Sequence, residues 1–320
     1  MMKMKTLLLG IMMLGMPLAA GAYDFESEGV YYGITGPSQV AVVTGDNYEG
    51  AYDGDVYIPD SVSHDGMNYT VTEIYYDAFF KCTRLGDVFL PSTITSLRWD
   101  AFLDTFVDDI VVRDLETWCN ISFEEDGCFG RMDPYPDVEV GIHGLLAGGQ
   151  QVTDVVIPES ITRIHDFTFY KTGAIRSVEI PGHVTRVGMG AFFGCTDLKS
   201  LKIGAGVDTI DHYAFNTDYY LFDWEFNVDR NVIDEVVCQA TVPPVMGGKY
   251  CFNQATYKRG TLYVPAQSLR AYCMDENWSR FENILPIPEP ATRKGDVNGD
   301  GVLNVTDVTT LIDLLLNGDH

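Results

Sequence analysis

A unit of about 23 residues recurs along this chain and limits its fold more than any other feature of the sequence. Its clearest copy, from Ile180 to Gly204, places apolar residues at offsets that the neighbouring copies repeat. Each copy contains a pair of residues that is usually Ala-Phe. The aromatic members of these pairs are Phe79, Phe102, Phe169, Phe192 and Phe215, of which the last three are spaced by 23 residues.

A single coil of this length cannot bury its own apolar side, whereas stacked coils cover one another. The alternation of apolar and polar residues in 178–180 and 201–203 indicates short strands, which successive coils would pair in parallel about 4.8 Å apart. Pro181 follows the first of these strands and ends it, because proline cannot donate to the ladder. The sequence therefore predicts a mainly β solenoid in which the five Phe rings form one interior column.

The pattern closely resembles the leucine-rich repeats of the BspA type, which are found in bacterial surface and secreted proteins. The residues that carry the resemblance are Ile180-Pro181, Val184, Val187, Ala191-Phe192, Cys195, Leu198 and Leu201. The resemblance implies a right-handed leucine-rich-repeat solenoid from Ile58 to the 280s, capped at both ends. It also implies a non-enzymatic role in adhesion, with an extracellular protein or glycan as the ligand of the repeats.

Caps are expected because the open edge of a stack of strands recruits other chains. A run of three prolines in five residues, at 286–290, marks the end of the solenoid and an extended linker. The expected parts are a signal peptide (1–22), an N-terminal β cap (23–57), leucine-rich repeats (58–240, irregular at about 113–151 and 218–230), a C-terminal repeat and cap (241–287), the Pro-rich linker (288–294) and a separate C-terminal repeat (295–320).

The first 22 residues have the three parts of a secretory signal peptide. Lys3 and Lys5 give a positive start, residues 7–18 are apolar, and Ala20-Gly21-Ala22 matches a cleavage site, so the mature chain would begin near Tyr23. No later stretch is apolar over a length that spans a bilayer. We therefore expect a secreted protein, extracellular or on a bacterial cell surface, without a transmembrane segment.

The chain is strongly acidic, with 21 Lys and Arg against 46 Asp and Glu and a formal net charge of −25. Such a surface repels the phosphates of nucleic acids and anionic lipid headgroups, so nucleic acid is a poor partner. Cationic partners or divalent ions suit this charge, and solubility alone would also account for it.

Two irregular segments interrupt the repeats, and each allows two interpretations. Residues 118–123 form either a protruding loop that carries binding residues or a repeat with a tolerated insertion. The second segment is rich in aromatic residues, which form either an exposed ligand-contact loop or a cover packed over the solenoid. Its aromatic residues are Tyr219, Tyr220, Phe222, Trp224 and Phe226.

Residues 296–307 contain the one motif that predicts a specific chemistry. Oxygen-bearing side chains at alternate positions, a Gly at the sixth position and an acid at the twelfth form the pattern of a calcium loop. A polar turn is the alternative, but Ca²⁺ takes about six to eight oxygen ligands, which this spacing supplies. The expected ligands are Asp296, Asn298, Asp300, the carbonyl of Val302, Asn304 directly or through a water, and Asp307.

An Asp at the twelfth position, where an ordinary EF-hand has Glu, makes this segment similar to a dockerin type I repeat. The resemblance implies that the following helix docks a cohesin-like scaffold, with the solenoid as cargo of an extracellular assembly. Complete dockerins carry two repeats and this sequence contains one, so another protein, a second copy or the solenoid must cover the apolar face. The residues expected on the docking helix are Val305, Thr306, Val308, Leu311, Ile312 and Leu315.

A secreted polysaccharide-acting enzyme is the third and least favoured function. The six histidines are scattered, and the sequence contains none of the nucleophile, zinc or phosphate motifs that would indicate catalysis. Of the seven cysteines, Cys82 and Cys195 share one offset in the repeat and are expected to be buried in the stack. Cys119 and Cys128 are candidates for a disulfide, which spacing alone does not establish.

Overall fold

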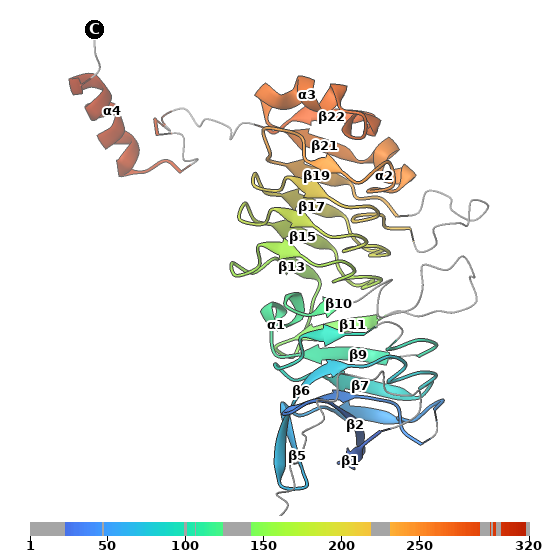
Figure 1. Ribbon diagram of the computed structural model, residues 1–320. Coiled ribbons are helices and arrows are strands. Elements are labelled where there is room, and N and C mark those ends of the chain that lie inside the picture. Colours follow the sequence, from blue (N-terminus) through green and yellow to red (C-terminus); the bar gives the residue numbers. More distant parts are fainter. Residues whose placement is uncertain are drawn as a thin grey trace, which may run out of the picture.

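The computed structural model describes residues 23–46, 48–98, 101–105, 107–123, 142–218, 231–288, 295, 297–298 and 302–317. Coils of about the predicted length lie one upon another and form an elongated, mainly β solenoid (Figure 1). The expected signal peptide and most of the linker lie outside the described residues.

The strands of the described residues form four sheets, two in each of two stacks of coils. In the first stack the five-stranded sheet has the order β12-β11-β9-β7-β4, and the other has the order β1-β2-β3-β6-β8-β10 with β5 paired to β6. The elements of this stack are β1 (Phe25–Ser27), β2 (Val30–Gly36), β3 (Gln39–Val42), β4 (Gly54–Tyr57), β5 (Ser61–His64), β6 (Met67–Ile74), β7 (Leu85–Phe89), β8 (Ser96–Leu97), β9 (Val107–Val112), α1 (Leu115–Cys119), β10 (Ser122–Phe123), β11 (Ile142–Ala147) and β12 (Gln150–Gln151).

The second stack is the more regular one, and its described strands pair only in parallel. Its sheets have the orders β13-β15-β17-β19-β21-β22 and β14-β16-β18-β20. The elements are β13 (Asp154–Val156), β14 (Arg163–Ile164), β15 (Ser177–Ile180), β16 (Arg186–Val187), β17 (Ser200–Ile203), β18 (Thr209–Ile210), β19 (Glu235–Cys238), β20 (Val245–Met246), α2 (Gln254–Arg259), β21 (Thr261–Val264), η1 (Ala266–Ser268), α3 (Leu269–Met274), η2 (Trp278–Arg280) and β22 (Asn283–Pro286), followed after the linker by α4 (Val305–Asn317).

The predicted Phe column is confirmed, in two segments. Phe79 and Phe102 stack in the first stack with ring centroids 4.7 Å apart. In the second, Phe192 lies 5.0 Å from Phe169 and 5.5 Å from Phe215, and all three are buried. These contacts bury large apolar rings against their own equivalents, which is why the repeat keeps one aromatic residue per coil.

Backbone geometry repeats with the same period. Phe167, Gly190 and Tyr213, each 23 residues apart, have φ values of 60°, 58° and 60°. Gly adopts this left-handed conformation at little cost, whereas Phe and Tyr adopt it only when surrounding structure imposes it. The geometry of the coil therefore imposes the positive φ at this position of the turn, whichever residue lies there.

The C-terminal end of the solenoid is closed as the sequence predicts. Residues 269–274 form helix α3, and the rings of Trp278 and Phe281 are buried against the end of the Phe column. Phe252 continues that column 5.4 Å from Phe215. Cys82 and Cys195 are buried, as expected from their shared offset.

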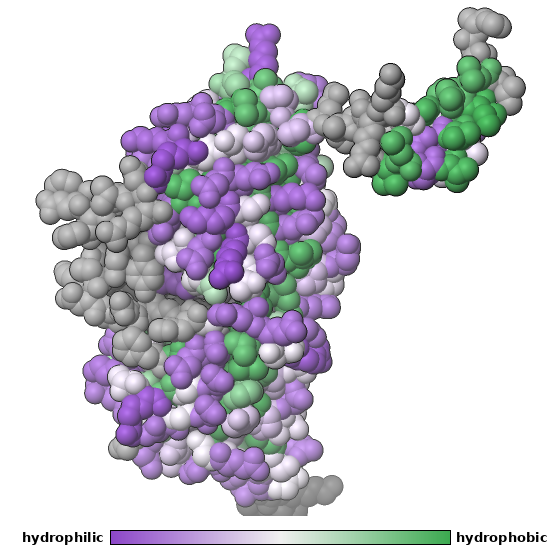
Figure 2. All heavy atoms as spheres, turned by 180° about the vertical axis from the view of Figure 1, so that it is seen from behind, coloured by the Kyte–Doolittle hydropathy of each residue, from purple (hydrophilic) through white to green (hydrophobic). Residues whose placement is uncertain are grey.

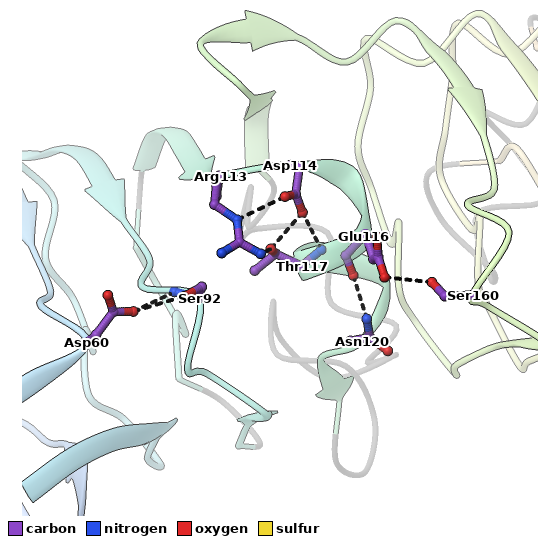
Figure 3. Close-up of polar contacts among 8 residues, drawn as sticks. All are labelled: Asp60, Ser92, Arg113, Asp114, Glu116, Thr117, Asn120 and Ser160. Carbon is purple, nitrogen blue, oxygen red and sulfur yellow. Dashed lines mark hydrogen bonds and ion pairs between the residues drawn. The ribbon is translucent and has the colours of Figure 1, made fainter.

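The two stacks meet at helix α1. The indole Nε1 of Trp118 donates to the carbonyl oxygen of Thr168 at 2.8 Å, and the Trp118 side chain is fully buried. The Ser160 hydroxyl donates to Glu116 at 2.8 Å across the same junction (Figure 3). On the neighbouring face, β12 pairs antiparallel with β11, so the parallel ladder of the five-stranded sheet ends there. Side chains from α1 therefore help to hold the junction.

Asp114 starts helix α1 as its N-cap. Its Oδ1 accepts the Thr117 amide and hydroxyl, both at 2.7 Å, and its Oδ2 accepts Arg113 Nε at 2.9 Å (Figure 3). The bonds from Thr117, then the one from Arg113, hold the pKa of the Asp114 carboxyl at about 2. Between the earlier coils, Asp60 accepts the Ser92 amide at 3.0 Å.

Candidate functional site

The irregular segment at 118–123 is not a protruding loop, and that interpretation is wrong. Trp118, Cys119 and Ile121 are buried, and Ser122 and Phe123 pair with β8 as strand β10. The segment is a coil with an insertion, the alternative that the sequence left open. Trp118 belongs to the core, and its buried indole finds a hydrogen-bond partner in the Thr168 carbonyl.

The C-terminal loop is closed by Asp307, the first-turn acid of α4. Its side chain is 3% exposed. Oδ1 accepts the amide of Val297 at 2.9 Å, and Oδ2 accepts the amide of Asn304 at 2.8 Å. The Asp307 carboxylate, at the twelfth position of the predicted loop, thus connects Val297 near the start of the loop with Asn304 near its end.

Asn304 bonds locally at the start of the same helix. Its Oδ1 accepts the Thr306 amide at 2.7 Å, as an N-cap does, and its Nδ2 donates to the Val302 carbonyl at 3.3 Å. The side-chain Nδ2 of Asn298 donates to the Thr306 hydroxyl at 3.0 Å. Asn298, Val302, Asn304 and Asp307 thus lie within one small hydrogen-bonded turn.

These residues fit a calcium site in their chemistry. Their oxygens are the hard ligands that Ca²⁺ prefers, and the ninth position of such loops often contacts the ion through a water, which suits the N-cap role of Asn304. The predicted ligands Asp296 and Asp300 lie outside the described residues. Within the described part of the chain, no three His, Cys, Asp or Glu side chains are grouped to hold a metal.

Helix α4 exposes an apolar surface along its length (Figure 2, green). Val305 is 73% exposed and Leu315 75%, and the other apolar residues predicted for docking are also exposed. Leu314, absent from the prediction, belongs to this surface as well. The exposed apolar residues are Val305, Val308, Leu311, Ile312, Leu314 and Leu315.

The aromatic residues of the second irregular segment, from Tyr219 to Phe226, lie outside the described residues. Their proposed contact with a ligand therefore stays a prediction. The described residues on either side, Thr217 and Asn231, hold the two ends of the segment together, because Asn231 Nδ2 donates to the Thr217 carbonyl at 3.1 Å.

A row of outward-facing strand residues was missed by the sequence analysis. One residue in each of these strands lies on the outer face of the sheet beside a buried neighbour, and in four coils it directly precedes an Ile-Pro or Leu-Pro pair. We call this row the outer column. In the first stack it comprises Tyr57, Phe89, Val111 and Leu146, and in the second Val156, Glu179, Lys202, Val237, Tyr263 and Leu285.

The two halves of the outer column differ in chemistry. Tyr57 is 63% exposed and stacks on Phe89 with ring centroids 4.2 Å apart, so the first half is aromatic and aliphatic. In the second half Lys202 Nζ pairs with Glu179 at 2.6 Å. Val156, at the start of this half, is 57% exposed. Four members of the column could have been found from the sequence, because they directly precede an Ile-Pro or Leu-Pro pair and strand side chains alternate between faces.

The described cysteines are all free thiols, and five of the six are buried. Burial raises the pKa of Cys119 to about 12 and that of Cys251 to about 11. A protonated, buried thiol is a poor nucleophile, so these cysteines serve packing. Cys128, the predicted disulfide partner of Cys119, lies outside the described residues.

A solenoid whose coils of about 23 residues pair through parallel strands has the architecture of leucine-rich-repeat proteins. The family described as BspA type leucine rich repeat region matches in six copies, over residues 61–128 and 146–241. These ranges span just over half of the chain. The protein belongs to this family.

Solved structures that are similar to this chain include two described as leucine-rich repeat proteins. A leucine-rich repeat protein from Bacteroides ovatus is 17% identical, with 83% of this chain and 77% of that one covered and a TM-score of 0.37. The T. pallidum leucine rich repeat protein TpLRR is 21% identical, covering 62% and 91%, with a TM-score of 0.33. The pneumococcal vaccine antigen PcpA is 13% identical, covering 84% and 99%, with a TM-score of 0.28.

No curated protein matches this sequence. Among the helices that the structure describes, none is long and apolar enough to cross a bilayer.

Proposed function

We propose that this protein is a non-enzymatic binding protein, secreted or displayed on a bacterial surface, whose solenoid recognises an extracellular protein or glycan. The observation that carries the proposal is the outer column, a row in each stack with exposed apolar side chains, to which the second stack adds an ion pair. Exposed apolar rows rimmed by polar residues are typical of interaction sites. The signal-peptide pattern of residues 1–22 supports the location.

A matched pair of substitutions tests this proposal. Val156→Glu places a charge on the outer column, and Val245→Glu places the same charge on β20 of the other sheet, where Val245 is 69% exposed. Binding of the mature chain to a panel of host-matrix proteins, envelope extracts and glycans would be measured for each. We expect Val156→Glu to lose at least about tenfold in affinity and Val245→Glu to retain it. Equal effects of the two variants, or turnover of a polysaccharide by the wild type, would contradict the proposal.

We also propose that residues 295–320 form a calcium-stabilised docking element. The support is the burial of Asp307 against its loop together with the exposed apolar side of α4. Bound Ca²⁺ would draw the loop oxygens around itself and fix the start of α4. The helix would then present its apolar residues to a partner, as in the dockerin–cohesin type of assembly, with the solenoid as cargo.

Two aspartates on α4 separate calcium binding from general charge effects. Asp307→Asn removes a predicted ligand, whereas Asp313→Asn removes an exposed carboxylate on the same helix. Calorimetry should detect Ca²⁺ binding to the wild type and Asp313→Asn, and at least about tenfold weaker binding to Asp307→Asn. If the two variants bind alike, the loop is a polar turn.

Deletion of residues 295–320 tests docking itself, with and without a chelator. Loss of retention on the producing cell while ligand binding survives would support a docking tail. Unchanged retention and unchanged binding would remove any docking role from this segment.

A further inference from the structure

The two sheets of the first stack end differently at the N-terminal end of the solenoid. The seven-stranded sheet continues beyond β6 through β3, β2 and β1. The five-stranded sheet stops at β4, and among the described strands only β7 pairs with it. The N-terminal strands thus extend one sheet and leave β4 as the edge of the other.

The opposite end of the same face is protected. There the last strand of the second stack, β22, ends in Pro286, and α3 packs against it. Proline and covering helices are the usual means by which proteins prevent further pairing at an edge strand. Strand β4 contains no proline, and Asp55 and Tyr57 on it are exposed.

The backbone of β4 is oriented for pairing on its free side. The amides of Gly54 and Ile58 donate to the carbonyls of Arg84 and Phe89 beside β7, at 2.8 and 3.1 Å. Because alternate residues of a strand direct their amides to opposite sides, the N–H and C=O groups of Asp55 and Tyr57 point to the free edge.

The side chains at this edge define what an added strand would meet. Tyr57 stacks on Phe89 on one face of its ring, with an interplanar angle of 11°, and the ring is otherwise largely exposed. Asp55 is exposed at the edge, where its Oδ1 accepts the Asp87 amide at 3.1 Å. Asp55, Asp87 and Asp109 each directly precede a buried strand residue, so the carboxylates form a row beside the outer column.

We propose that β4 is a docking edge for an extended segment of a partner protein, which pairs in parallel as one more strand. The segment carries a basic residue beside Asp55 and an aromatic residue beside Tyr57, with one residue between them. The register sets this spacing: an aromatic ring would continue the Tyr57–Phe89 stack, and a Lys or Arg would meet the acidic row. This site shares Tyr57 with the outer column, but it is formed by the free backbone edge of β4 and not by the outer face of the sheet, and it is independent of the C-terminal tail.

A second copy of this chain fits the edge less well than a basic partner. Pairing of two β4 strands would bring a second Asp55 to the same edge, and like charges across a strand pair are destabilising. The net charge of −25 adds repulsion between whole molecules.

The test uses the mature full-length chain and a synthetic peptide, acetyl-Thr-Lys-Val-Tyr-Val-Thr-amide. In a parallel pair, the amide of the Val between Lys and Tyr donates to the Asp55 carbonyl, whereas the Tyr amide points away. N-methylation of that Val should weaken binding by about tenfold, and N-methylation of the Tyr by about twofold or less. A Lys-to-Glu peptide should bind at least about fivefold more weakly.

Protein variants locate the site. Tyr57→Ala should weaken binding of the peptide about threefold to fivefold, and Tyr263→Ala, at an interior position of the outer column, should leave it unchanged. Circular dichroism would establish that both variants keep the fold. Amide hydrogen exchange should show new protection at Asp55 and Tyr57 when the peptide is present.

Three results would overturn the proposal. The first is no detectable binding at millimolar peptide, and the second is equal weakening by the two N-methylations. The third is a concentration-dependent dimer that protects the Asp55 and Tyr57 amides without peptide, which would make a second copy the occupant.

Discussion

The two stacks of this solenoid bury the same kind of core, but their strands pair less regularly in the first stack than in the second. In the second stack, Ser177, Ser200 and Glu235 lie in exact register from strand to strand. In the first stack the register shifts between β4 and β7, and the antiparallel hairpin β5–β6 is inserted into a coil. The stacks therefore share a buried core with stacked aromatic rings, while the rest of the coil tolerates shifts of register and insertions.

The largest expected effect is in the regular stack. Phe192→Ala removes a ring that stacks on both sides and leaves a buried cavity, so the free energy of unfolding should fall by about 3–5 kcal/mol. Urea denaturation measures the loss, and hydrogen exchange should place it mainly in β15, β17 and β19. Phe192→Leu, which fills more of the cavity, should lose less. A loss below about 1 kcal/mol would mean that the column does not hold the coils.

The next effect tests whether the stacks fold as one unit. Trp118→Phe removes the indole donor and leaves the buried Thr168 carbonyl without it, which should cost about 1–3 kcal/mol. Trp278→Phe is the matched control, because its indole also donates to a carbonyl, that of Pro244, at 2.8 Å, but within the second stack. Only Trp118→Phe should separate the unfolding of the two stacks in hydrogen exchange. If both variants unfold in a single transition, the junction has other strong contacts.

Sequence periodicity is sufficient to predict the interior of both stacks. The Phe offsets placed Phe192 and its equivalents correctly, because a residue buried in one coil must be buried in every coil that repeats it. The break between the stacks was not predicted. Its signal is local: Gly148 and Gly149, with φ of 60° and 76°, make the tight turn that reverses β11 into β12, a pairing that such residues favour.

The candidate sites were harder to predict from the sequence than the core. The ligand pattern of residues 296–307 predicts a type of loop, but the apolar side of α4 does not indicate which surface covers it. The repeat pattern does not predict that β4 is an exposed edge. Whether β4 has a neighbour on its free side depends on which sheet the N-terminal strands join. That choice is made by tertiary pairing and not by local preference.

A smaller effect concerns the cap of α1 at the junction. Asp114→Ala should reduce stability by about 0.5–2 kcal/mol, whereas Asp114→Asn, which keeps an acceptor, should lose less. The pKa of Asp114 is lowered from its ordinary 3.8 to about 2, so its contribution is complete above about pH 4 and is lost as the pH falls towards 2. Urea denaturation between pH 2 and 5 should show a shallower slope for Asp114→Ala than for the wild type. If the stability of Asp114→Ala and that of the wild type fell equally with pH, the acid sensitivity would come from other carboxylates.

The smallest effect lies on the outer column. Glu179 and Lys202 are each 45% exposed, so water screens their ion pair, and Lys202→Met should change stability by less than about 1 kcal/mol. The difference should vanish in 1 M NaCl when thermal unfolding is compared with the wild type. A loss that persists in high salt would mean that the Lys202 stem contributes by packing.

The antiparallel turn between β11 and β12 has a mechanical consequence. A pulling force along the solenoid axis must unzip parallel ladders one coil at a time within either stack, but at the turn none of the described strands continues such a ladder on that face. There it is opposed by side-chain bonds, among them the one from the Trp118 indole. A tethered molecule of this kind would yield at its middle first, and each half would remain wound.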